Sequence, residues 1–428
     1  IHSLFQLPFG PNVPGMKREI SKQFQFSKKK VNLLRSLDLL IIDEISMVRA
    51  DILDGIDAVL RRYKDRNKPF GGVQLLMIGD LHQLPPVVKS ADWELLKKHY
   101  TTAYFFGSNA LKETNPITIQ LTHIYRQSDA VFIKLLNKVR DNKLDVEVLD
   151  LLNSRHIPNF RPAEKEGYIT LTSHNRTANA INEEKLSALP QSVYRFKATI
   201  KGEFPENNYP TEETLAFKVG AQVLFIKNDN SRERAYYNGK IGQITAIEDK
   251  VIYVKCPSDR EAIAVKRVDW KNIKYSLDPN DEIQEEEKGT FIQYPLKLAW
   301  AITIHKSQGL TFERAIIDAQ DAFAHGQVYV ALSRCKSFEG IVLRSTIGYA
   351  SVKTDVVIKD YSEEAEKNAP DEVALLESKK EYQQELIEEL FSFRRIKTAR
   401  QLVGRIYLEF EKNLAIEARE QFELWERK

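Results

Sequence analysis

Continuous apolar runs that stop at acidic or polar residues recur in the first part of the chain. Residues 37–42 form one such run, which stops at Asp43-Glu44, and residues 73–78 form another, which stops at Gly79-Asp80. Such runs predict buried parallel strands, whose carboxyl ends form the ligand-binding edge of an open α/β sheet. Between them, segment 50–62 has apolar residues at helical spacing and predicts a helix.

Further apolar runs predict a second α/β domain. They cover residues 168–172, 315–317 and 341–343. We therefore expect a first domain over residues 1–163 and a second over residues 164–354. From Asp371 onward, apolar residues fall on helical stripes, so residues 355–428 predict helices that pack on the other domains.

Short strands with a tight turn interrupt the second domain at about residues 229–289. Asn238-Gly239 is a turn sequence between two apolar segments, and Glu285-Glu286-Glu287 is expected to be a solvated exit loop. The strands are predicted at residues 223–226, 241–245, 251–255 and 262–266. This pattern favours a small β-barrel insertion.

The composition is that of an ordinary globular protein with more than one domain. The chain has 428 residues, of which 43% are hydrophobic and 29% charged, and a net charge of +3. A charge of this size says little about partners, because a binding groove can be basic in a nearly neutral protein. Cys256 and Cys335 have no metal-ligand spacing and indicate a reducing compartment. No apolar run is long enough for a membrane span, and no signal-peptide pattern starts the chain.

Asp43 and Glu44 stand where a nucleotide site needs carboxylates. Phosphoryl transfer needs one group to hold Mg²⁺ and a second to orient the attacking water. We expect Asp43 to hold the metal ion and Glu44 to act as the general base. An ordinary polar strand end is the alternative for this pair taken alone.

The segment 79–87, which reads Gly-Asp-Leu-His-Gln-Leu-Pro-Pro-Val, is more specific. The amide of Gln83 can hydrogen-bond the γ-phosphate or its water and so report whether that phosphate is present. Pro85 and Pro86 stiffen the loop that follows. The alternative is a polar turn without a role in binding.

Two sequence segments in different predicted domains each end near an arginine. Arg126 lies near the end of segment 121–127, and Arg334 ends segment 328–334. A guanidinium is a bidentate partner for phosphate. Both are expected to approach one γ-phosphate, so that ATP binding closes a cleft and hydrolysis opens it. Either arginine alone could instead form a surface ion pair.

A polar cluster follows the apolar segment 299–302. Its hydroxyl, imidazole and ammonium groups suit a phosphodiester backbone, and Gly309 permits close approach to a nucleotide. The cluster comprises Thr303, His305, Lys306, Ser307, Gln308 and Gly309. The alternative, a buried helix with a polar end, explains the apolar segment but not the cluster.

Together these segments resemble the motifs of superfamily 1 helicases. The phrases at residues 79–87 and 305–309 resemble the Pif family, whose relative is RecD. The opening segment 1–5 resembles the motif that follows the P-loop and contacts single-stranded DNA in that family. The resemblance, which extends to about residue 350, implies two RecA-like P-loop NTPase domains. It also implies a wedge-like insertion at about residues 5–36, an SH3-like β-barrel insertion and C-terminal helices.

The resemblance implies an ATP-dependent 5′-to-3′ DNA helicase that moves on single-stranded DNA and unwinds duplexes. The family often unwinds G-quadruplexes and serves DNA repair, recombination and telomere maintenance, so these roles are expected too. ATP is the expected substrate and Mg²⁺ the cofactor. The expected DNA contacts are His2, Ser3, Phe5, His82, Ser173, His174, Asn175, Arg176, Thr303, His305, Lys306 and Ser307.

The expected partners are single-stranded DNA and junctions between single and double strands, with no membrane. We expect a monomer whose dimerisation DNA promotes. The expected location is the cytoplasm in a bacterium, or the nucleus or mitochondrion in a eukaryote.

The sequence departs from the family at its first motif. The phosphate-binding P-loop, G-x-x-x-x-G-K-[ST], is absent, and the chain begins at Ile1 without an initiator Met. Since that loop cradles the phosphates, we expect a stretch upstream of residue 1 to be missing. An ATP-independent protein that binds single-stranded nucleic acid is one alternative, and an RNA helicase of superfamily 1 is another.

Segment 5–36 interleaves aromatic and basic residues. Phe24 and Phe26 lie among lysines and arginines, a mixture that suits base stacking and phosphate contact where a duplex parts. The alternative is a solvated loop whose phenylalanines form a small core of their own.

Overall fold

The computed structural model describes most of the chain, which forms two units. Unit 1 comprises residues 1–116 and 121–363, and unit 2 comprises residues 117–120 and 364–428. The described residues are 1–7, 10–13, 26–127, 129–163, 166–231, 233–257, 259–277, 283–318, 326–352, 355–391, 393–410 and 414–426.

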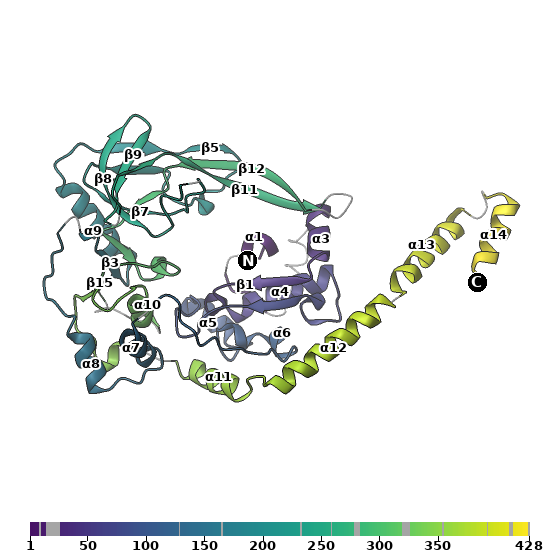
Figure 1. The fold of residues 1–428 in the computed structure, drawn as a ribbon. Helices are drawn as coiled ribbons and strands as arrows, with labels where there is room; N and C mark the ends of the chain where they lie inside the picture. The colour runs from purple at the N-terminus through teal and green to yellow at the C-terminus, as the bar shows by residue number, and fades with distance from the viewer. Residues whose placement is uncertain are drawn as a thin grey trace. The chain divides into compact units, whose positions relative to one another are not determined.

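The first sheet contains the two strands predicted from the opening apolar runs. Strand β1 (Leu39–Ile42) pairs in parallel with β2 (Gln74–Met77), so that Leu39 lies opposite Gln74 and Ile42 opposite Met77. Helix α4 (Ala50–Tyr63) connects them, which confirms the predicted helix (Figure 1). Its apolar face is buried in one core with β1 through Ile52, Leu53, Ile56, Val59 and Leu60.

The prediction that these strands are buried on both faces is wrong. Leu40 and Ile42 are buried, but Leu39 and Ile41 are 46% and 55% exposed. Successive strand side chains point to opposite faces, and within the described residues the core that holds α4 takes up only one of them. The other elements of this region are α1 (His2–Phe5), α3 (Lys28–Arg35), η1 (Ile45–Met47), η2 (Pro69–Gly72), α5 (Ser90–Leu96), η3 (Phe105–Gly107) and α6 (Asn109–Lys112).

The second sheet is parallel and contains the later predicted strands. Its order is β14 (Ala301–Thr303), β3 (Ile169–Thr172), β15 (Ala315–Asp318), β16 (Ile341–Leu343). Its helices are α7 (Ala130–Arg140), α8 (Val146–Asn153), α9 (Asn175–Ala188) and α10 (Gln327–Ser333). Residues of α7 and α8 such as Phe132 and Val148 belong to its core, although the predicted boundary at residue 163 assigns both helices to the first domain.

A β-rich segment follows α9 and has a core of its own. Its five-stranded antiparallel sheet has the order β10 (Ile263–Val265), β9 (Val251–Lys255), β8 (Ile241–Glu248), β7 (Gln222–Phe225), β13 (Leu296–Leu298). All four strands predicted for the insertion are present. Gly239, at φ +98°, lies in the turn between β7 and β8, as expected of a turn glycine.

The β structure is wider than the predicted insertion at residues 229–289. Strand β5 (Thr199–Gly202) joins β11 (Val268–Leu277) and β12 (Ile283–Gln293), and β4 (Tyr194–Lys197) pairs with β6 (Thr214–Phe217). The prediction of an exit loop at Glu285-Glu286-Glu287 is wrong, because these residues belong to β12. Strand pairing places opposite charges across the ribbon, and Lys271 forms an ion pair with Glu287 at 2.9 Å.

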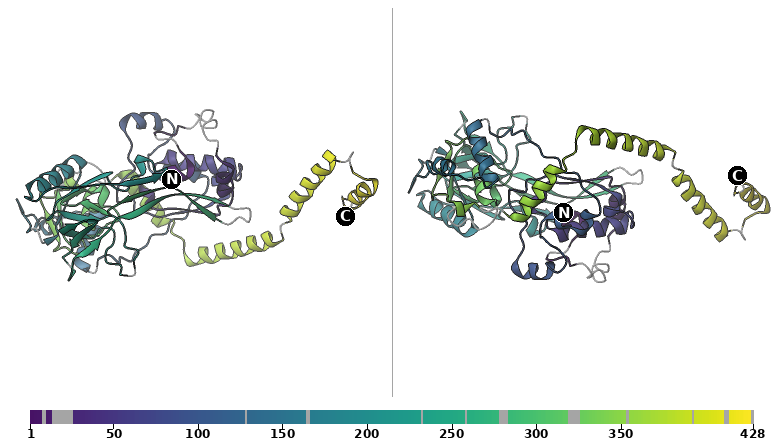
Figure 2. Two further views of the ribbon diagram at one scale, coloured as in Figure 1. Left: turned by 90° about the horizontal axis from the view of Figure 1, so that it is seen from above. Right: turned by 90° about the horizontal axis from the view of Figure 1, so that it is seen from below.

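Helices make up the end of the chain, as predicted. Helix α11 (Val356–Lys367) is followed by α12 (Glu372–Leu390), α13 (Arg394–Phe410) and α14 (Ile416–Glu426). Helices α12 and α13 are separate rods (Figures 1 and 2). Tyr407 stacks on Phe422 at 4.0 Å between ring centroids, which joins α13 to α14. The expectation that these helices pack on the other domains stays a prediction. Among the described residues, no helix has the length and apolar character needed to cross a membrane.

Candidate active site

Two acidic residues follow β1 directly. Asp43 is exposed, and its Oδ1 accepts a hydrogen bond from the backbone N–H of Glu44 at 2.8 Å. Glu44 has left-handed backbone angles, φ 51° and ψ 46°. A non-glycine residue with left-handed backbone angles is uncommon and is found more often at functional sites. From this turn, the Glu44 carboxylate reaches Gln308 of the second sheet's loops.

Asp80 holds the loop that follows β2. Its Oδ1 accepts from the backbone N–H of His82 at 3.0 Å, and its Oδ2 accepts from Nε2 of Gln83 at 3.1 Å. These two bonds fix the orientation of the Gln83 amide. Its oxygen is thereby left to face a partner from the second sheet.

That partner is Gln308, which the sequence analysis placed in the polar cluster without a role of its own. Its Nε2 donates to Oε2 of Glu44 at 2.9 Å and lies 3.5 Å from Oε1 of Gln83. One amide therefore connects the carboxyl-end loops of both sheets. The neighbouring Gly309, at φ +75° with open space around a Cβ, was the available signal for a special backbone position here.

Arg334 is 1% exposed, at the end of α10. Its donors serve its own helix and loop: Nε donates to the carbonyl of Val330 at 3.1 Å and Nη2 to Oγ of Ser333 at 3.0 Å. Burial and the nearby Arg126 lower the pKa of Arg334 to about 10, against the opposing effect of the Glu44 and Asp80 carboxylates. The guanidinium stays charged at neutral pH.

Arg126 lies near Arg334, and the expectation that both approach one γ-phosphate stays a prediction. Arg126 donates through Nη1 to the carbonyl of Ser333 at 3.4 Å, while the residue as a whole is exposed. Gln127 adds bonds from Nε2 to the carbonyls of Ser333 and Cys335, both at 3.1 Å. The structure thus brings two guanidinium groups to one region that also contains Glu44.

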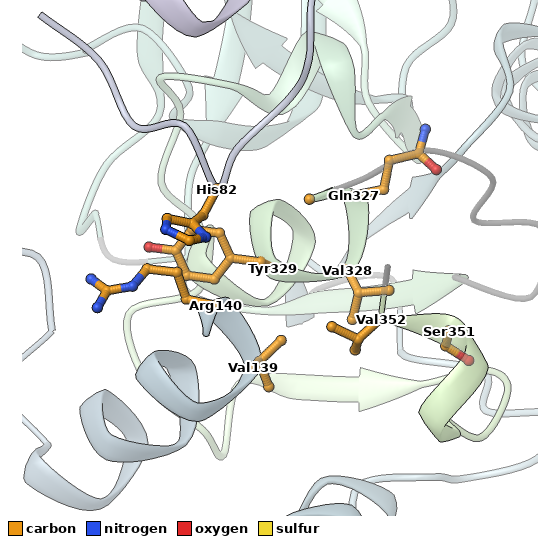
Figure 3. A pocket seen from close by; sticks show the side chains of 9 residues that line it. His82, Val139, Arg140, Gln327, Val328, Tyr329, Ser351 and Val352 are labelled. Atoms are coloured by element: carbon orange, nitrogen blue, oxygen red, sulfur yellow. The ribbon is translucent and has the colours of Figure 1, made fainter. Parts of the chain in front are cut away.

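A small pocket lies between His82, Arg140 and Tyr329 (Figure 3). The Asp80 carboxylate lies near the hydroxyl of Tyr329, and burial together with that carboxylate raises the pKa of the hydroxyl. The pocket volume of about 10 Å³ admits about one water molecule, so it is not a nucleotide site. Gly326 has no room for a side chain, because a Cβ there would lie 2.1 Å from the carbonyl oxygen of Gln83.

The predicted DNA-contacting residues of the second sheet divide into exposed and buried ones. Lys306 is exposed, as are His174, Asn175 and Arg176 at the start of α9. Ser173 is 8% exposed and its Oγ lies 2.7 Å from Nδ1 of His174. The exposed members remain candidates for contact with a nucleic-acid backbone.

The predicted side-chain contacts of Thr303 and Ser307 are wrong. Both residues are buried, Ser307 completely. The Ser307 hydroxyl donates to the carbonyl of Ile304 at 2.7 Å, and Oγ1 of Thr303 accepts from the N–H of Lys306 at 3.3 Å. Their hydroxyl groups shape the loop that presents Lys306. His305 is half-buried, and burial lowers its pKa.

The predicted contact of Phe5 with DNA does not fit the position of its side chain. Its ring is 1% exposed and belongs to the core beneath α4, so stacking on a base is excluded in this conformation. His2 and Ser3 lie in the short helix α1, and His82 is half-buried beside Tyr329. Their predicted contacts with DNA stay predictions.

The predicted wedge residues are only partly described. Phe24 lies outside the described residues. Phe26 stacks on Tyr63 with ring centroids 5.0 Å apart, and the ammonium of Lys30 lies 5.1 Å from the Phe26 ring. Phe26 therefore packs at the edge of the core around α4, and neither the wedge nor a separate core of the segment follows from this contact.

Comparisons with known proteins agree on one family. The sequence profile of the family described as "PIF1-like helicase" matches residues 1–149. The human ATP-dependent DNA helicase PIF1 is 35% identical over 310 residues, which are 71% of this chain and 45% of the relative, so the chain spans less than half of that protein. The bacterial Pif1 of Campylobacter jejuni is 32% identical over 81% of this chain and 78% of its own length.

Solved structures give the same result for the fold. The structure of a Bacteroides sp. Pif1 in complex with ADP-AlF4 has a TM-score of 0.79 and 42% identity, over 86% of this chain and 84% of that one. A structure of Bacteroides Pif1 bound to single-stranded DNA matches over the same shares at a TM-score of 0.61 and 42% identity. The expected fold of two RecA-like domains is therefore confirmed. On sequence and structure alike, the chain belongs to the PIF1-like helicase family.

Proposed function

We propose that this chain forms most of an ATP-dependent motor that moves 5′ to 3′ on single-stranded DNA and unwinds duplex DNA. The hydrogen bond between Gln308 and Glu44 carries the proposal, because it connects a catalytic candidate of the first sheet to the DNA-facing loop of the second. The relatives, which are named as ATP-dependent DNA helicases, support the same activity. An ATP-independent DNA-binding protein is not favoured, since it leaves this constellation without a use.

The roles follow from charge and position. Glu44 accepts a proton from the water that attacks the γ-phosphate, and the amide of Gln83 orients that water or the phosphate. Arg126 and Arg334 stabilise the charge that develops on the phosphate oxygens. Since Gln83 and Arg334 come from different sheets, binding of one phosphate draws the two domains together.

The residues fit Mg²⁺. This ion keeps several waters and is usually bound by one or two carboxylates together with the substrate phosphates, and the exposed carboxylate of Asp43 stands at the end of β1 beside Glu44. Asp43 would hold the ion, which when bound neutralises phosphate charge. Gly309 lets the backbone of its loop approach the nucleotide closely.

The DNA groove is proposed to run along Lys306, His174, Asn175 and Arg176 and to continue to helix α1. Backbone contacts of this kind give an affinity that depends on salt and little on base sequence. Junctions between single and double strands and G-quadruplexes are the proposed substrates for unwinding.

The domain division is also a proposal, with domains at residues 1–163, 164–354 and 355–428. The packing of α7 and α8 in the second core favours moving the first boundary to just before α7. We further propose a monomer that DNA induces to dimerise and an intracellular location, in the cytoplasm of a bacterium or the nucleus or mitochondrion of a eukaryote.

The test replaces Glu44 by Gln in a protein that also carries the P-loop segment required for phosphate binding. Hydrolysis should be abolished while nucleotide and DNA binding persist, because only the proton acceptor is lost. The matched control is Asp38→Asn at the opposite end of β1, where the carboxylate is 96% exposed; this variant should hydrolyse ATP normally. Near-normal turnover of Glu44→Gln would refute the assignment.

A further inference from the structure

Helix α4 carries three aspartates at successive turns, and each holds a different segment of the chain. Asp54 accepts from the hydroxyl of Tyr100 at 3.0 Å and the N–H of Ala110 at 3.1 Å. Asp57 accepts from the N–H of Phe70 at 2.6 Å. Asp51, which is 1% exposed, accepts from the N–H of Asn12 at 2.8 Å. The third segment is therefore the one that follows helix α1.

Polar contacts hold residues 10–13 at the start of α4. Besides the bond to Asp51 Oδ2, Asn12 donates through Nδ2 to the backbone carbonyl of Asp51 at 2.9 Å. Arg49 bridges the segment and helix α4, since its Nη2 donates to the carbonyl of Gly10 at 2.6 Å and forms an ion pair with Asp51 at 2.6 Å. The segment itself thus supplies part of the hydrogen bonding that a buried carboxylate requires.

Apolar contacts hold the same segment on either side of these bonds. Phe5 and Leu7 are buried in the core beneath α4. Val13 packs on the neighbouring cluster, which contains Ala50 and Tyr100. The chain from α1 to Val13 is therefore anchored before, at and after Asn12.

Gly55 makes this close approach possible. A Cβ at this position would lie 2.6 Å from Nδ2 of Asn12 and 3.1 Å from Cδ2 of Leu7. Glycine is unfavourable inside a helix compared with alanine, so its presence in the middle of α4 has a packing reason. A side chain here must push the Asn12 amide away from its position on the helix.

We propose that Arg49, Asp51 and Gly55 form a seat on α4 that positions the DNA-contacting segment around α1. This inference rests on the proposed function, which assigns contact with single-stranded DNA to that segment. The seat does not touch the DNA. It fixes the path of the chain so that the backbone and polar groups of α1 meet the phosphates in one arrangement.

The experiment measures binding of a short oligothymidine to the full chain by fluorescence anisotropy at several salt concentrations. Asn12→Ala removes the side-chain bond from Nδ2 to the backbone carbonyl of Asp51 and keeps the backbone N–H that donates to the carboxylate, so affinity should fall about fivefold, the effect of losing one hydrogen bond between neutral groups. The slope of log K against log salt should become shallower as phosphate contacts are lost. Gly55→Ala should weaken binding similarly.

The matched control is Asp57→Asn, on the same helix but holding a different segment. It should lower thermal stability and leave affinity and salt slope at the parent values. In a double-mutant cycle, Asn12→Ala should add little to Gly55→Ala, because both disturb the same contact of the Asn12 amide with the Asp51 carbonyl. Rescue of affinity is not expected from either single change.

Three results would overturn the seat: parent-like binding by Asn12→Ala, an equal loss of affinity in Asp57→Asn, or additive effects in the cycle. If the parent chain itself does not bind the oligonucleotide, the proposed function fails and the seat fails with it. If the parent binds and Asn12→Ala binds equally well, the seat alone is wrong.

Discussion

Nε2 of Gln308 donates a hydrogen bond to Oε2 of Glu44 at 2.9 Å, across the two parallel sheets. The donor belongs to the loop that presents Lys306, and the acceptor is the proposed general base. A neutral amide can hold a carboxylate in position without changing its charge. The contact therefore gives the loop that presents Lys306, which is proposed to contact DNA, a direct means of influencing the orientation of the base.

Exchanging this amide for a carboxylate should shift the pH dependence of hydrolysis. In Gln308→Glu, a like charge beside Glu44 disfavours the ionised form and raises the pKa of the pair. The base is then protonated up to a higher pH, so turnover should be low at neutral pH and recover as the pH rises. Measurement of the hydrolysis rate as a function of pH checks this, with Gln308→Ala as the uncharged control. Identical acidic limbs in the two variants would contradict the prediction.

Removal of Arg126 and removal of Arg334 should affect the stability of the protein differently, although both should reduce ATP turnover. Arg126→Ala and Arg334→Ala are each expected to reduce hydrolysis by about 10³- to 10⁵-fold, the range of arginine fingers. Arg334 also donates to Val330 and Ser333 from a buried position, so Arg334→Ala should lower the Tm as well, whereas the exposed Arg126 can be removed without that loss. A variant within tenfold of parent turnover would show that its arginine has a structural role only.

The hydroxyl of Tyr329 should matter through Asp80 and Gln83. Tyr329→Phe removes the hydroxyl that lies near Asp80 and keeps the ring, so Asp80 holds the Gln83 amide less firmly. The loss of about 1 kcal/mol predicts that kcat falls about fivefold while the KM for ATP is unchanged. Steady-state kinetics beside the control Tyr349→Phe, whose ring is 58% exposed, test this. An unchanged kcat would mean that Asp80 orients Gln83 without help from α10.

The sequence was sufficient for elements whose signal is local. The runs ending at Asp43-Glu44 and at Gly79-Asp80 became strands β1 and β2, and their order along the chain fixed which loops meet at one sheet edge. These strand predictions needed only periodicity and the geometry of parallel sheets. The prediction that Arg126 and Arg334 approach one γ-phosphate rests instead on the sequence motifs around them and stays a prediction.

Side-chain burial was not readable in the same way. Phe5 and Ser307 belong to motif phrases that the family resemblance assigns to DNA, but their exposure depends on packing with α4 and on the turn after Ile304. The acidic run at residues 285–287 lies in β12, which pairs with the preceding strand β11 and places Glu287 beside Lys271; a run of three acidic residues does not by itself indicate such a pairing. Gln308 was overlooked since its partner Glu44 lies 264 residues away in the chain.

Lys306 and its neighbour His305 should contribute to DNA binding at different pH. Lys306 is exposed on the loop that Thr303 and Ser307 shape, so its ammonium is available to a phosphate at neutral pH. Lys306→Ala should weaken binding of oligothymidine and reduce the salt slope by about one, without eliminating basal hydrolysis. Parent-like affinity at several salt concentrations would exclude Lys306 from the groove.

For His305 the sign is set by burial, which lowers its pKa from the ordinary value of 6.5. The imidazole is therefore mostly neutral at pH 7 and gains its proton at a lower pH than an exposed histidine would. Between pH 7 and 8 the His305→Gln variant should match the parent in affinity and salt slope. As the pH falls toward 5, the parent should gain affinity through the added charge beside the phosphates, and His305→Gln should lack that part of the gain. Anisotropy titrations across this pH range decide the point, because equal gains in parent and variant would mean that the charge of His305 does not reach the DNA.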